Sequence, residues 1–264
     1  MPETRQWDGK SYDRISGPME GLGLEVLTRL ELNGDEVVLD AGCGSGRVTQ
    51  ALLERLPSGR VIAVDVSRSM VEAARKRLGA PAPSGSTPAG GRSGRVEVRL
   101  LDLLHLALPE PVDAVFSTAT FHWIPDHDRL FRRLHAALRP GGRLVAQCGG
   151  EGNIDVLRGE ANAVLAGEPY AEHFRGWRPP WNYRGAEETR SRLLEAGFTS
   201  AECWLMPAPK QPEHPREFLS TIVLGPHVQR LPAELRDRFL DEVLARLGEP
   251  VVVDYVRLNI DATA

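Results

Sequence analysis

The sequence predicts an α/β fold built around a parallel β-sheet. Along the first 150 residues, short apolar runs rich in β-branched residues alternate with segments whose apolar residues recur at helical spacing. A glycine-rich turn follows the first of these runs. Alternation of this kind produces parallel strands joined by right-handed helical crossovers. With 264 residues, of which 42% are hydrophobic, the chain can bury a sizeable core in one large domain or in one domain with a cap.

The first two strand–helix pairs follow one another closely. Residues 36–41 (EVVLDA) are apolar and β-branched, and residues 60–64 have a similar composition and lead to Asp65. Each run is followed by a helix, and Ser67 or Ser69 can cap the second one. One face of each helix is apolar; the residues are Val48, Leu52, Leu53 and Leu56 in the first helix, and Met70, Val71, Ala74 and Leu78 in the second.

Residues 80–94 (APAPSGSTPAGGRSG) interrupt this alternation. Ten of these 15 residues are Pro, Gly or Ser, a composition that does not bury enough apolar surface to order itself. We expect a mobile insertion between a helix and a strand, because the alternation resumes at residues 96–101.

The next elements extend the sheet. Residues 112–117 and 143–148 are apolar enough to form strands. Between them, residues 126–138 form a helix that Pro140-Gly141-Gly142 ends. Its apolar stripe consists of Leu130, Phe131, Leu134 and Leu138.

Beyond Gly150 the pattern is less regular, and Pro, Trp and Tyr residues with weak periodicity continue to about Tyr183. Pro232 fits the first turn of a late helix, whose apolar residues are Leu235, Phe239, Val243 and Leu247. The other elements expected in this part are a helix at about 187–196, a strand at 201–205, a proline-rich loop at 207–215 and a final strand at 253–260.

Charge and composition exclude several classes of protein. The 32 basic and 36 acidic residues give a net charge of −4, which argues against a general affinity for nucleic acids or acidic membranes. No run approaches the ~18 apolar residues of a membrane span, and the N-terminal residues lack an apolar signal core. Cys43, Cys148 and Cys203 are too far apart for a CxxC zinc site or a disulfide framework. We therefore expect a cytoplasmic protein with reduced cysteines.

The turn after the first strand, Asp40-Ala41-Gly42-Cys43-Gly44-Ser45-Gly46, suits a ligand that approaches the backbone closely. Its spacing is G-x-G-x-G, whereas the dinucleotide-binding pattern G-x-G-x-x-G would need glycine in place of Arg47. Asp40 would repel a pyrophosphate but suits a cationic amino group. Asp65, 19 residues after Gly46, can accept hydrogen bonds from both hydroxyls of a ribose. A cofactor with a ribose, an ammonium group and no phosphate has the chemistry of S-adenosyl-L-methionine.

These motifs resemble those of the class I S-adenosylmethionine-dependent methyltransferases, over most of residues 34–149. VLDAGCGSG resembles the family's first motif, VIAVDVS its ribose-binding strand, and LRPGGRL its helix-to-strand turn. The resemblance implies that Met70 packs on the adenine and that Asp102 contacts its amino group. The full set of cofactor-binding residues that it implies is Asp40, Gly42, Cys43, Gly44, Gly46, Asp65, Val66, Met70, Asp102, Leu103 and Thr118.

The same resemblance implies a Rossmann-like α/β fold with a seven-stranded, mostly parallel sheet, helices on both faces and a small lid of helices and loops. The chain then divides into an N-terminal helical lid segment at 1–33 and a cofactor-binding core at 34–150, which contains the insertion at 80–94. Residues 151–264 supply further lid segments and the C-terminal helices and strands that complete the sheet.

The methyl acceptor is expected beyond the carboxyl ends of the fourth and fifth strands, where ligands of open α/β sheets bind. This region lacks the Asn-Pro-Pro-Tyr-like motif of enzymes that methylate amino groups of adenine or glutamine. FHWIPDHDRLFRRLHAALRPGGRL instead resembles the trans-aconitate methyltransferase group and related small-molecule enzymes, as do an N-terminal Trp and Tyr, a Pro-Trp segment and the closing VRLNIDA. That resemblance implies a carboxylate acceptor. The expected acceptor-binding residues are Trp7, Tyr12, Phe121, His122, Trp123 and Trp181.

Three roles remain open for His122. A carboxylate is already a nucleophile at neutral pH, and His122 and Tyr12 would then donate hydrogen bonds to it. If the acceptor is a hydroxyl or a phenol, His122 is the candidate catalytic base. The third role is packing beside Trp123. No metal site is expected, since Pro125 separates His122 from Asp126 and His127 and no coordination spacing follows.

Residues beyond Gly150 include candidates for binding the charges of the acceptor and for excluding water from it. The spare charges of a tricarboxylate would need basic partners, for which Arg175, Arg178 and Arg184 are candidates. The density of aromatic residues in this segment and near the N-terminus predicts a lid that excludes water; these are Trp7, Tyr12, Trp177, Trp181 and Tyr183.

The sequence therefore predicts an enzyme that transfers a methyl group from S-adenosyl-L-methionine to a carboxylate or hydroxyl oxygen of a small molecule. The alternatives are methylation of carbon or nitrogen in a small molecule, and a non-catalytic protein that binds the same cofactor. A Rossmann dehydrogenase is disfavoured by the glycine spacing and by Asp40. The expected partner is a small-molecule acceptor, with no nucleic acid, membrane or metal involved, and the protein is expected to be a monomer or a homodimer.

Overall fold

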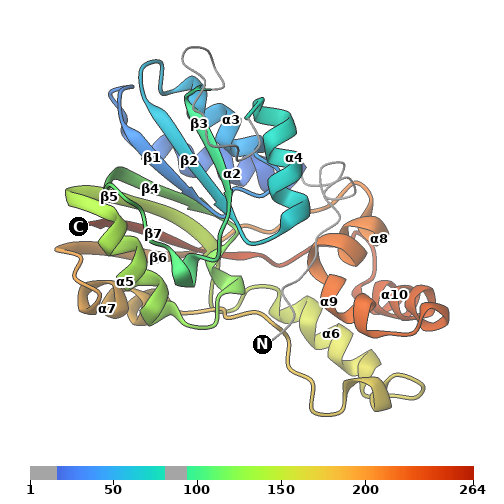
Figure 1. Ribbon diagram of the computed structural model, residues 1–264. Coiled ribbons are helices and arrows are strands. Elements are labelled where there is room, and N and C mark those ends of the chain that lie inside the picture. Colours follow the sequence, from blue (N-terminus) through green and yellow to red (C-terminus); the bar gives the residue numbers. More distant parts are fainter. Residues whose placement is uncertain (1–16, 81–93) are drawn as a thin grey trace.

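A computed structural model describes residues 17–80 and 94–264, without the side chains of residues 17–20 (Figure 1). The predicted acceptor contacts Trp7 and Tyr12 lie outside the described residues. So does nearly all of the insertion predicted at 80–94.

Seven strands of the described chain form one sheet, in the order β3-β2-β1-β4-β5-β7-β6. All neighbours pair in parallel except β7, which runs antiparallel to both β5 and β6. The predicted seven-stranded, mostly parallel sheet is thereby confirmed. The strands are β1 (Val37–Ala41), β2 (Arg60–Asp65), β3 (Val96–Leu100), β4 (Val112–Thr118), β5 (Leu138–Gly149), β6 (Ser200–Pro207) and β7 (Val256–Thr263).

Burial along the strands explains why the sequence forms this sheet. The central strands β1, β2 and β4 are almost continuously buried, because helices cover both faces of a parallel sheet. β6 lies at the edge and alternates between exposed and half-buried residues, as strands in antiparallel pairs do.

Helices cover both faces of the sheet and enclose two apolar cores. One core joins α2 (Gly17–Arg29), α3 (Arg47–Glu54) and α4 (Arg68–Leu78) to the sheet. The other joins α5 (His127–Ala137) and α7 (Ala186–Glu195) to its opposite face. At the start of α4, the Ser67 hydroxyl bonds the Ser69 hydroxyl at 3.0 Å, so the side-chain cap expected there is absent.

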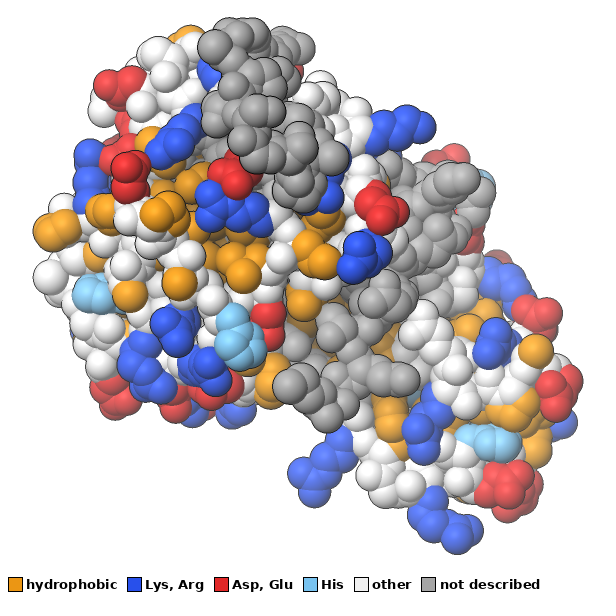
Figure 2. Space-filling view, viewed as in Figure 1, with side chains coloured by type: hydrophobic (Ala, Val, Ile, Leu, Met, Phe, Trp, Pro, Cys, Tyr) orange, Lys and Arg blue, Asp and Glu red, His pale blue; other side chains and the backbone are white. Residues whose placement is uncertain are grey.

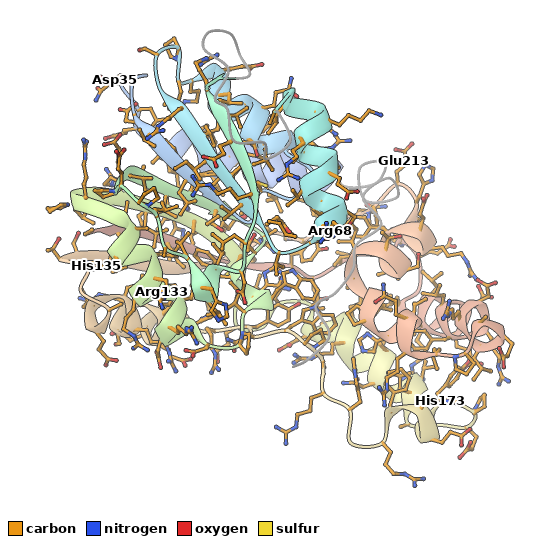
Figure 3. All side chains as sticks on the ribbon, viewed as in Figure 1. Asp35, Arg68, Arg133, His135, His173 and Glu213 are labelled. Carbon is orange, nitrogen blue, oxygen red and sulfur yellow. The ribbon has the colours of Figure 1, made fainter. Side chains whose placement is uncertain are left out.

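Six further helices, from the second half of the described chain, form a separate group beyond one end of the sheet (Figure 1). We call this group the helical cap, and it has an apolar core of its own. Its elements are α6 (Asp155–Leu165), η4 (Ala171–Phe174), α8 (Pro215–Phe218), η5 (Leu219–Val223), α9 (Gly225–Arg230) and α10 (Ala233–Leu247). Figure 3 gives the orientation: Asp35 precedes β1 at the amino edge, whereas Arg68 begins α4 on the carboxyl-edge side and His173 lies in the cap.

Two expectations for the second half of the chain are wrong in detail. The irregular segment expected after Gly150 contains α6, which buries Leu157 and Ala161 against the cap core, where α10 also packs. The last strand begins at Val256 rather than at residue 253, because Val253 pairs with Lys210 and packs in the cap. In both places, packing partners far away in the sequence decide the local structure.

Charges on the surface are mixed. On the face in Figure 2, Lys and Arg side chains lie among Asp and Glu side chains over both the sheet region and the cap. Among the helices of residues 17–80 and 94–264, none is long and apolar enough to cross a membrane.

Candidate active site

The glycine loop between β1 and α3 is held from two sides. The backbone N–H groups of Gly42 and Cys43 both donate to the carbonyl oxygen of Val64 in β2, each at 2.9 Å. From the other side, Thr120 Oγ1 donates to the carbonyl oxygen of Gly42 at 3.2 Å. Gly46 then starts α3 with a left-handed φ of 82°. These contacts fix the loop at the carboxyl edge of the sheet.

Asp65, the last residue of β2, binds the same loop. Its Oδ2 accepts the N–H of Gly44 at 3.0 Å, and its Oδ1 accepts the N–H of Ser67 at 2.8 Å. Burial raises the pKa of Asp65, and these hydrogen bonds oppose the increase. A carboxylate oxygen has two lone pairs, so each oxygen can also accept a ligand hydroxyl. Val66 beside it is 47% exposed and offers apolar surface next to the carboxylate.

Asp40 lies almost fully buried at the end of β1. Burial raises its pKa to about 7, the hydrogen bond from Thr49 Oγ1 at 2.6 Å opposes the increase, and the negative charge of Asp65 adds to it. An ammonium group next to Asp40 would stabilise the ionised carboxylate and lower this pKa again.

The residues of the loop fit S-adenosyl-L-methionine. A Cβ atom on Gly44 would meet no atom of the described residues within 4 Å, so this part of the chain leaves space there. The two carboxylates at the ends of β1 and β2 make this space acidic, which suits an ammonium group and hydroxyls and disfavours a phosphate. Asp40 can therefore hold the amino group and Asp65 the ribose, while the backbone around Gly44 allows close approach.

The other predicted cofactor residues lie at or near the same edge with different exposure. Asp102 caps η2 (Leu103–His105): its Oδ1 accepts the N–H of Leu104 at 2.9 Å, and its Oδ2 lies 3.2 Å from His105 Nδ1. Leu103 is 5% exposed and Met70 is 3% exposed, so both side chains are buried. Thr118 ends β4, close to where α2 packs.

The segment after β4 turns sharply beside the glycine loop. Ser117 Oγ donates to the carbonyl oxygen of Ala41 at 2.6 Å, and Thr120 Oγ1 bonds the carbonyl oxygen of Thr118 as well as Gly42. Between them, Ala119 has a φ of 54°, a left-handed conformation that alanine rarely adopts. Backbone strain of this kind concentrates at functional sites. The short helix η3 (Phe121–Trp123) follows.

One hydrogen bond sets the tautomer of the neutral His122 ring, whose residue is 7% exposed. The N–H of Gly149 donates to His122 Nδ1 at 3.2 Å. A backbone N–H can only donate, so Nδ1 carries no proton and the neutral ring has its proton on Nε2. The rings of Trp123 and Tyr183 lie at centroid distances of 5.1 and 5.8 Å. His122 is therefore a hydrogen-bond donor through Nε2.

A short segment after the Pro-Trp pair ties the cap to the sheet. The N–H of Asn182 donates to the carbonyl oxygen of His122 at 2.8 Å, and its side-chain Nδ2 donates to that of Ile124 at 2.9 Å. Trp181 and Tyr183 stack with an interplanar angle of 10°. A continuous row of rings thus leads from the end of β4 into the cap. This aromatic row consists of His122, Trp123, Tyr183, Trp181 and His227.

Phe121 lies on the other side of η3. Its side chain is 1% exposed and packs edge-on against Phe131 of α5, at a centroid distance of 6.1 Å. His127 Nε2 lies 3.0 Å from the Phe121 carbonyl oxygen. Phe121 therefore anchors the short helix that carries His122.

The three arginines expected to hold an acceptor differ in placement: Arg184 forms a β-bridge with Gly150, directly after β5. Arg175 and Arg178 are exposed. Arg184 forms an ion pair with Glu188 at 3.2 Å.

Sequence reasoning missed a buried polar network between β5 and β7. Arg257 Nε donates to Gln147 Oε1 at 3.3 Å, and Gln147 Nε2 donates to Asn259 Oδ1 at 2.9 Å. Arg29 Nη1 donates to the same Asn259 oxygen at 2.5 Å and pairs with Asp261 at 3.5 Å. The available signal was the period-2 spacing of Arg257, Asn259 and Asp261, which puts three polar side chains on one face of an otherwise apolar strand.

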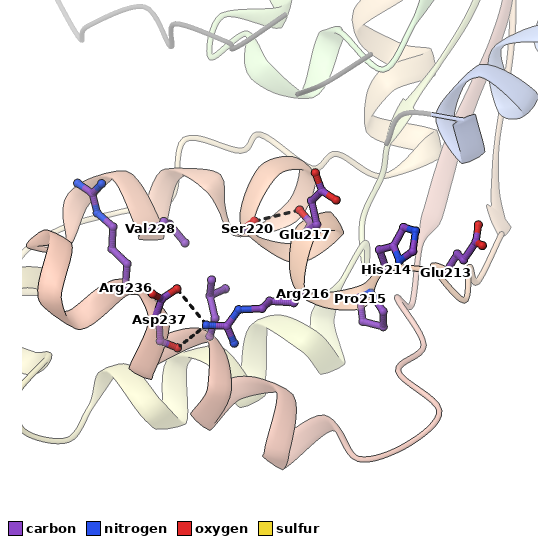
Figure 4. Close-up of a pocket in the computed structure, with 10 residues that line it drawn as sticks. Glu213, His214, Pro215, Arg216, Glu217, Ser220, Val228, Arg236 and Asp237 are labelled. Carbon is purple, nitrogen blue, oxygen red and sulfur yellow. Dashed lines mark hydrogen bonds and ion pairs between the residues drawn. The ribbon is translucent and has the colours of Figure 1, made fainter. Parts of the chain in front are cut away.

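The cap has a hollow of its own away from the glycine loop, and the described residues form no metal site. A hollow of about 570 Å³ lies on the cap, where Arg216 pairs with Asp237 at 3.0 Å (Figure 4). Arg216 also pairs with Asp241. The hollow is built from α8, α9 and α10 and their connections, not from the glycine loop. No group of three His, Cys, Asp or Glu residues in the described ranges is arranged to hold a metal ion.

Comparison with known proteins agrees with this fold and loop. A family model described as a methyltransferase domain matches residues 39–146. The trans-aconitate 2-methyltransferase of Variovorax paradoxus (strain S110) is 30% identical, over 96% of this chain and 93% of its own length. That of Acidovorax sp. (strain JS42) is 28% identical, over 92% and 89%.

A solved structure shows the same fold. Haemonchus contortus phosphoethanolamine N-methyltransferase 2, in complex with phosphomonomethylethanolamine and S-adenosylhomocysteine, aligns with a TM-score of 0.62 at 19% identity. The alignment covers 97% of this chain and 56% of that one. The chain is an enzyme of the class I S-adenosylmethionine-dependent methyltransferase family, and S-adenosyl-L-methionine is its cofactor.

Proposed function

We propose that the enzyme methylates a carboxylate oxygen of a small molecule and releases a methyl ester. When bound, S-adenosyl-L-methionine would supply an electrophilic methyl group for a carboxylate oxygen of the acceptor, and its sulfur would keep the electron pair as S-adenosylhomocysteine. The relatives that match nearly the whole chain carry the name trans-aconitate 2-methyltransferase, which supports an acceptor of this class.

The observation that carries the choice of a carboxylate over a phenol is the hydrogen bond from Gly149 to His122 Nδ1. It occupies the basic nitrogen and leaves the ring as a donor at Nε2. A hydroxyl or phenol acceptor needs a base to remove its proton, whereas a carboxylate is already ionised. A neutral donor therefore serves by orienting the acceptor oxygen.

The contribution of the protein is then mainly to position the reactants and exclude water. In-line placement of oxygen, methyl and sulfur supplies much of the rate enhancement in such a transfer. The aromatic row surrounds His122 with apolar rings, which removes water from the carboxylate and makes it a better nucleophile. Trp123 and Trp181 belong to this row and are proposed contacts of the acceptor.

The proposed cofactor site follows the carboxyl edge of the first three strands. Asp40 and the loop Gly42–Gly46, including Cys43, hold the amino-acid end, with Thr118 beside them at the end of β4. Asp65 holds the ribose, and Val66 supplies exposed apolar surface to the adenine. The further proposed adenine-binding residues are Met70, Asp102 and Leu103.

Replacing Asp65 by alanine tests the cofactor site. Asp65→Ala removes the acceptor of the ribose hydroxyls and releases the N–H groups of Gly44 and Ser67. We expect the affinity for S-adenosyl-L-methionine to fall by roughly 1.5–3 kcal/mol, about 10- to 150-fold, in a calorimetric titration. Asp126→Ala is the matched control, because this carboxylate only caps α5 through the N–H of Arg129. Equal affinities for Asp65→Ala and the control would rule out the ribose contact.

Replacing His122 separates the donor role from the base role. His122→Ala should lower kcat by roughly 10- to 100-fold through lost orientation of the acceptor, with cofactor affinity unchanged. Because the donor role involves no titration of the ring in the reaction, the pH profile of kcat should keep its shape in the variant. An acid limb present in the parent and absent in His122→Ala would instead identify a general base.

The acceptor itself is identified by turnover with S-adenosyl-L-methionine and three compounds: a tricarboxylate such as trans-aconitate, a phenol and an amine. Mass spectrometry of a product that hydroxide hydrolyses back to the acceptor would identify a methyl ester. An alkali-stable product from the phenol or the amine, with none from the carboxylate, would reject the proposal in favour of ether formation or N-methylation.

We further propose that the acceptor is free in solution in the cytoplasm and that no nucleic acid takes part. The net charge of −4 and the intermixed charges in Figure 2 support this. The proposed assembly is a monomer or a homodimer, which light scattering of the purified protein would determine.

A further inference from the structure

We propose that Thr49 is a positioning residue for the cofactor: its hydroxyl engages one carboxylate oxygen of Asp40, which leaves the other for the ammonium group, and cofactor binding expels a proton from that second oxygen. This inference rests on the proposed contact between Asp40 and the amino group of S-adenosyl-L-methionine. It is independent of which acceptor is methylated.

Strand β1 and helix α3 bring the two side chains together. Thr49 is the third residue of α3 and is 0% exposed. Asp40 is the fourth residue of β1 and points to the same side of the sheet as Val38, because side chains two residues apart in a strand share a face. Val38 packs in the core that also contains Leu52 of α3. Thr49 Oγ1 donates to Asp40 Oδ2 at 2.6 Å, a distance typical of a hydroxyl that bonds an ionised carboxylate.

This hydrogen bond makes the two oxygens of Asp40 unequal. Within residues 17–80 and 94–264, no second hydrogen bond reaches the carboxylate, so Oδ1 is the oxygen left for a ligand. Because the Thr49 hydroxyl donates to Oδ2, the proton of an uncharged Asp40 carboxyl group is on Oδ1. That proton and the ammonium group of the cofactor therefore compete for the same atom.

The surroundings of Asp40 favour its protonated form until a cation binds. Burial raises the pKa of Asp40 to about 7, and the negative charge of Asp65 at the end of β2 adds to the increase. Burial and the two carboxylates also raise the pKa of the Cys43 thiol, which is therefore neutral at pH 7. An ammonium group beside Asp40 would reverse the balance, because an opposite charge favours the ionised carboxylate.

The elements around the loop carry further charged groups. Arg47 begins α3, and Arg77 of α4 donates through Nε to a carbonyl oxygen of the glycine loop at 3.0 Å. From β4, Phe116 pairs in register with Asp40 and carries no charge. Among these groups, Asp65 is the one whose charge shifts the pKa of Asp40. The compensating positive charge therefore has to come from the ligand.

A cofactor affinity that falls in acid follows from this competition. Between pH 7 and pH 6 the free protein increasingly holds a proton on Asp40 Oδ1, which has to leave for the solvent as the ammonium group binds. Affinity should then fall by up to about tenfold per pH unit below pH 7. Above about pH 8 the amino group of the free cofactor loses its own proton, so measurements between pH 6 and pH 7 isolate Asp40.

A purely structural role for Thr49 predicts a different result. The residue is fully buried, so its hydroxyl could serve only to join α3 to β1. Loss of that role would lower stability and would weaken every ligand of the glycine loop alike. Loss of a positioning role would weaken only ligands that carry the ammonium group, and it would change the pH at which they bind.

The test measures binding and proton release without turnover. S-adenosylhomocysteine and 5′-methylthioadenosine are titrated calorimetrically at pH 6.0 and 7.0, in buffers of different ionisation enthalpy. The second compound has the same adenosine and sulfur but lacks the amino-acid end, so it corrects for any proton that the ribose displaces from Asp65. At pH 6.0 we expect the parent to release roughly 0.8 proton more per S-adenosylhomocysteine than per 5′-methylthioadenosine. Asp40→Asn should remove this difference.

Thr49→Val keeps the shape of the side chain and removes the hydroxyl. Its affinity for S-adenosylhomocysteine at pH 7.0 should fall about 5- to 50-fold, because losing a hydrogen bond to a charged group moves the titration of Asp40 up by about one to two pH units. Affinity for 5′-methylthioadenosine should stay within about threefold, and Thr49→Ser should bind both ligands nearly as the parent does. Thr189→Val is the matched control, at a fully buried threonine of α7 whose hydroxyl bonds the Gly185 carbonyl oxygen at 2.7 Å.

Equal proton release with the two ligands overturns the inference. So does parent-like affinity for S-adenosylhomocysteine in Thr49→Val, or an equal loss for both ligands. If Thr49→Val does not fold, proton release by the parent and by Asp40→Asn decides. If Asp40→Asn binds S-adenosylhomocysteine as tightly as the parent, the proposed contact of Asp40 with the amino group is itself wrong. If Asp40→Asn weakens S-adenosylhomocysteine alone while the parent releases no extra proton, the contact stands and this inference is wrong.

Discussion

Gly42→Ala should abolish cofactor binding at micromolar concentrations and lower the thermal stability of the protein. A Cβ atom at this position would lie 2.1 Å from Thr120 Oγ1 and 2.4 Å from Thr120 Cγ2. Thr120 cannot turn away without loss, because its hydroxyl bonds the carbonyl oxygens of Gly42 and Thr118. Gly42 also has a φ of 92°, which alanine strains to adopt. Overpacking and backbone strain together cost roughly 2–5 kcal/mol.

The matched control is Gly79→Ala, at the end of α4. Gly79 also has a positive φ, 63°, but a Cβ atom there would meet no atom of residues 17–80 and 94–264 within 4 Å. It carries the conformational cost alone, about 1–2 kcal/mol, away from the glycine loop. Calorimetric titration with S-adenosyl-L-methionine should show parent-like affinity for the control. Adding Thr120→Ala to Gly42→Ala removes the two nearest atoms and should restore part of the lost affinity; parent-like binding by Gly42→Ala alone would refute the steric argument.

His227 should make the protein lose stability as the pH falls from about 6.5 to about 4. This residue of α9 is 0% exposed and lies among aromatic rings of the cap, with Trp177 at 4.8 Å and Trp181 at 5.6 Å. In the part of the chain that the structure describes, neither ring nitrogen has a hydrogen-bond partner. Burial lowers the pKa of His227 from 6.5 to about 4. The aromatic row therefore includes His227 as a histidine that is neutral at pH 7.

The sign of the effect follows from proton uptake. Between pH 6.5 and about 4 the unfolded chain binds a proton at His227 and the folded chain does not, so each pH unit lowers the free energy of unfolding by about 1.4 kcal/mol. The contribution is fully present above pH 6.5, and roughly 3 kcal/mol of it is lost near pH 4.

Urea unfolding of the parent and of His227→Phe between pH 7 and pH 4.5 measures this contribution. Phenylalanine keeps a ring in the row and removes both unpaired nitrogens, so the variant should be at least as stable as the parent at pH 7 and should gain on it as the pH falls. The difference between the two proteins is the relevant quantity, because the raised pKa of Asp40 opposes the effect of His227. His173→Gln is the control, at a partly exposed histidine of the cap. Parallel pH profiles for the parent and His227→Phe would show that His227 takes up its proton equally in the folded and unfolded chains.

The cofactor half of the site was predictable because its chemistry is local in the sequence. Asp40 and the loop glycines belong to one strand–turn–helix unit, and Asp65 ends the strand that pairs beside it in a parallel sheet. Once the alternation of strands and helices indicates a parallel sheet, the carboxyl ends of neighbouring strands must meet at one edge. The residues that meet there can then be named without coordinates.

The proposed acceptor site was less predictable because its residues come from separated segments. His122 follows β4, Gly149 ends β5, and Tyr183 lies between η4 and α7. Arg175 and Arg178, which lie in the aromatic segment of the sequence, are exposed. Arg257 in the last strand is buried, and the antiparallel pairing of β7 with β5 puts it in register with Gly149.

The sequence by itself therefore determined the alternation of strands and helices, the parallel sheet and the place of the proposed cofactor loop, since these follow from periodicity and from turns encoded within about 30 residues. Only the tertiary structure decided which nitrogen of His122 carries its proton, which arginine is buried, and that a histidine stands unpaired within the cap. Each of these depends on a hydrogen bond or on burial between residues distant in the chain, and no single local segment of the sequence encodes such contacts.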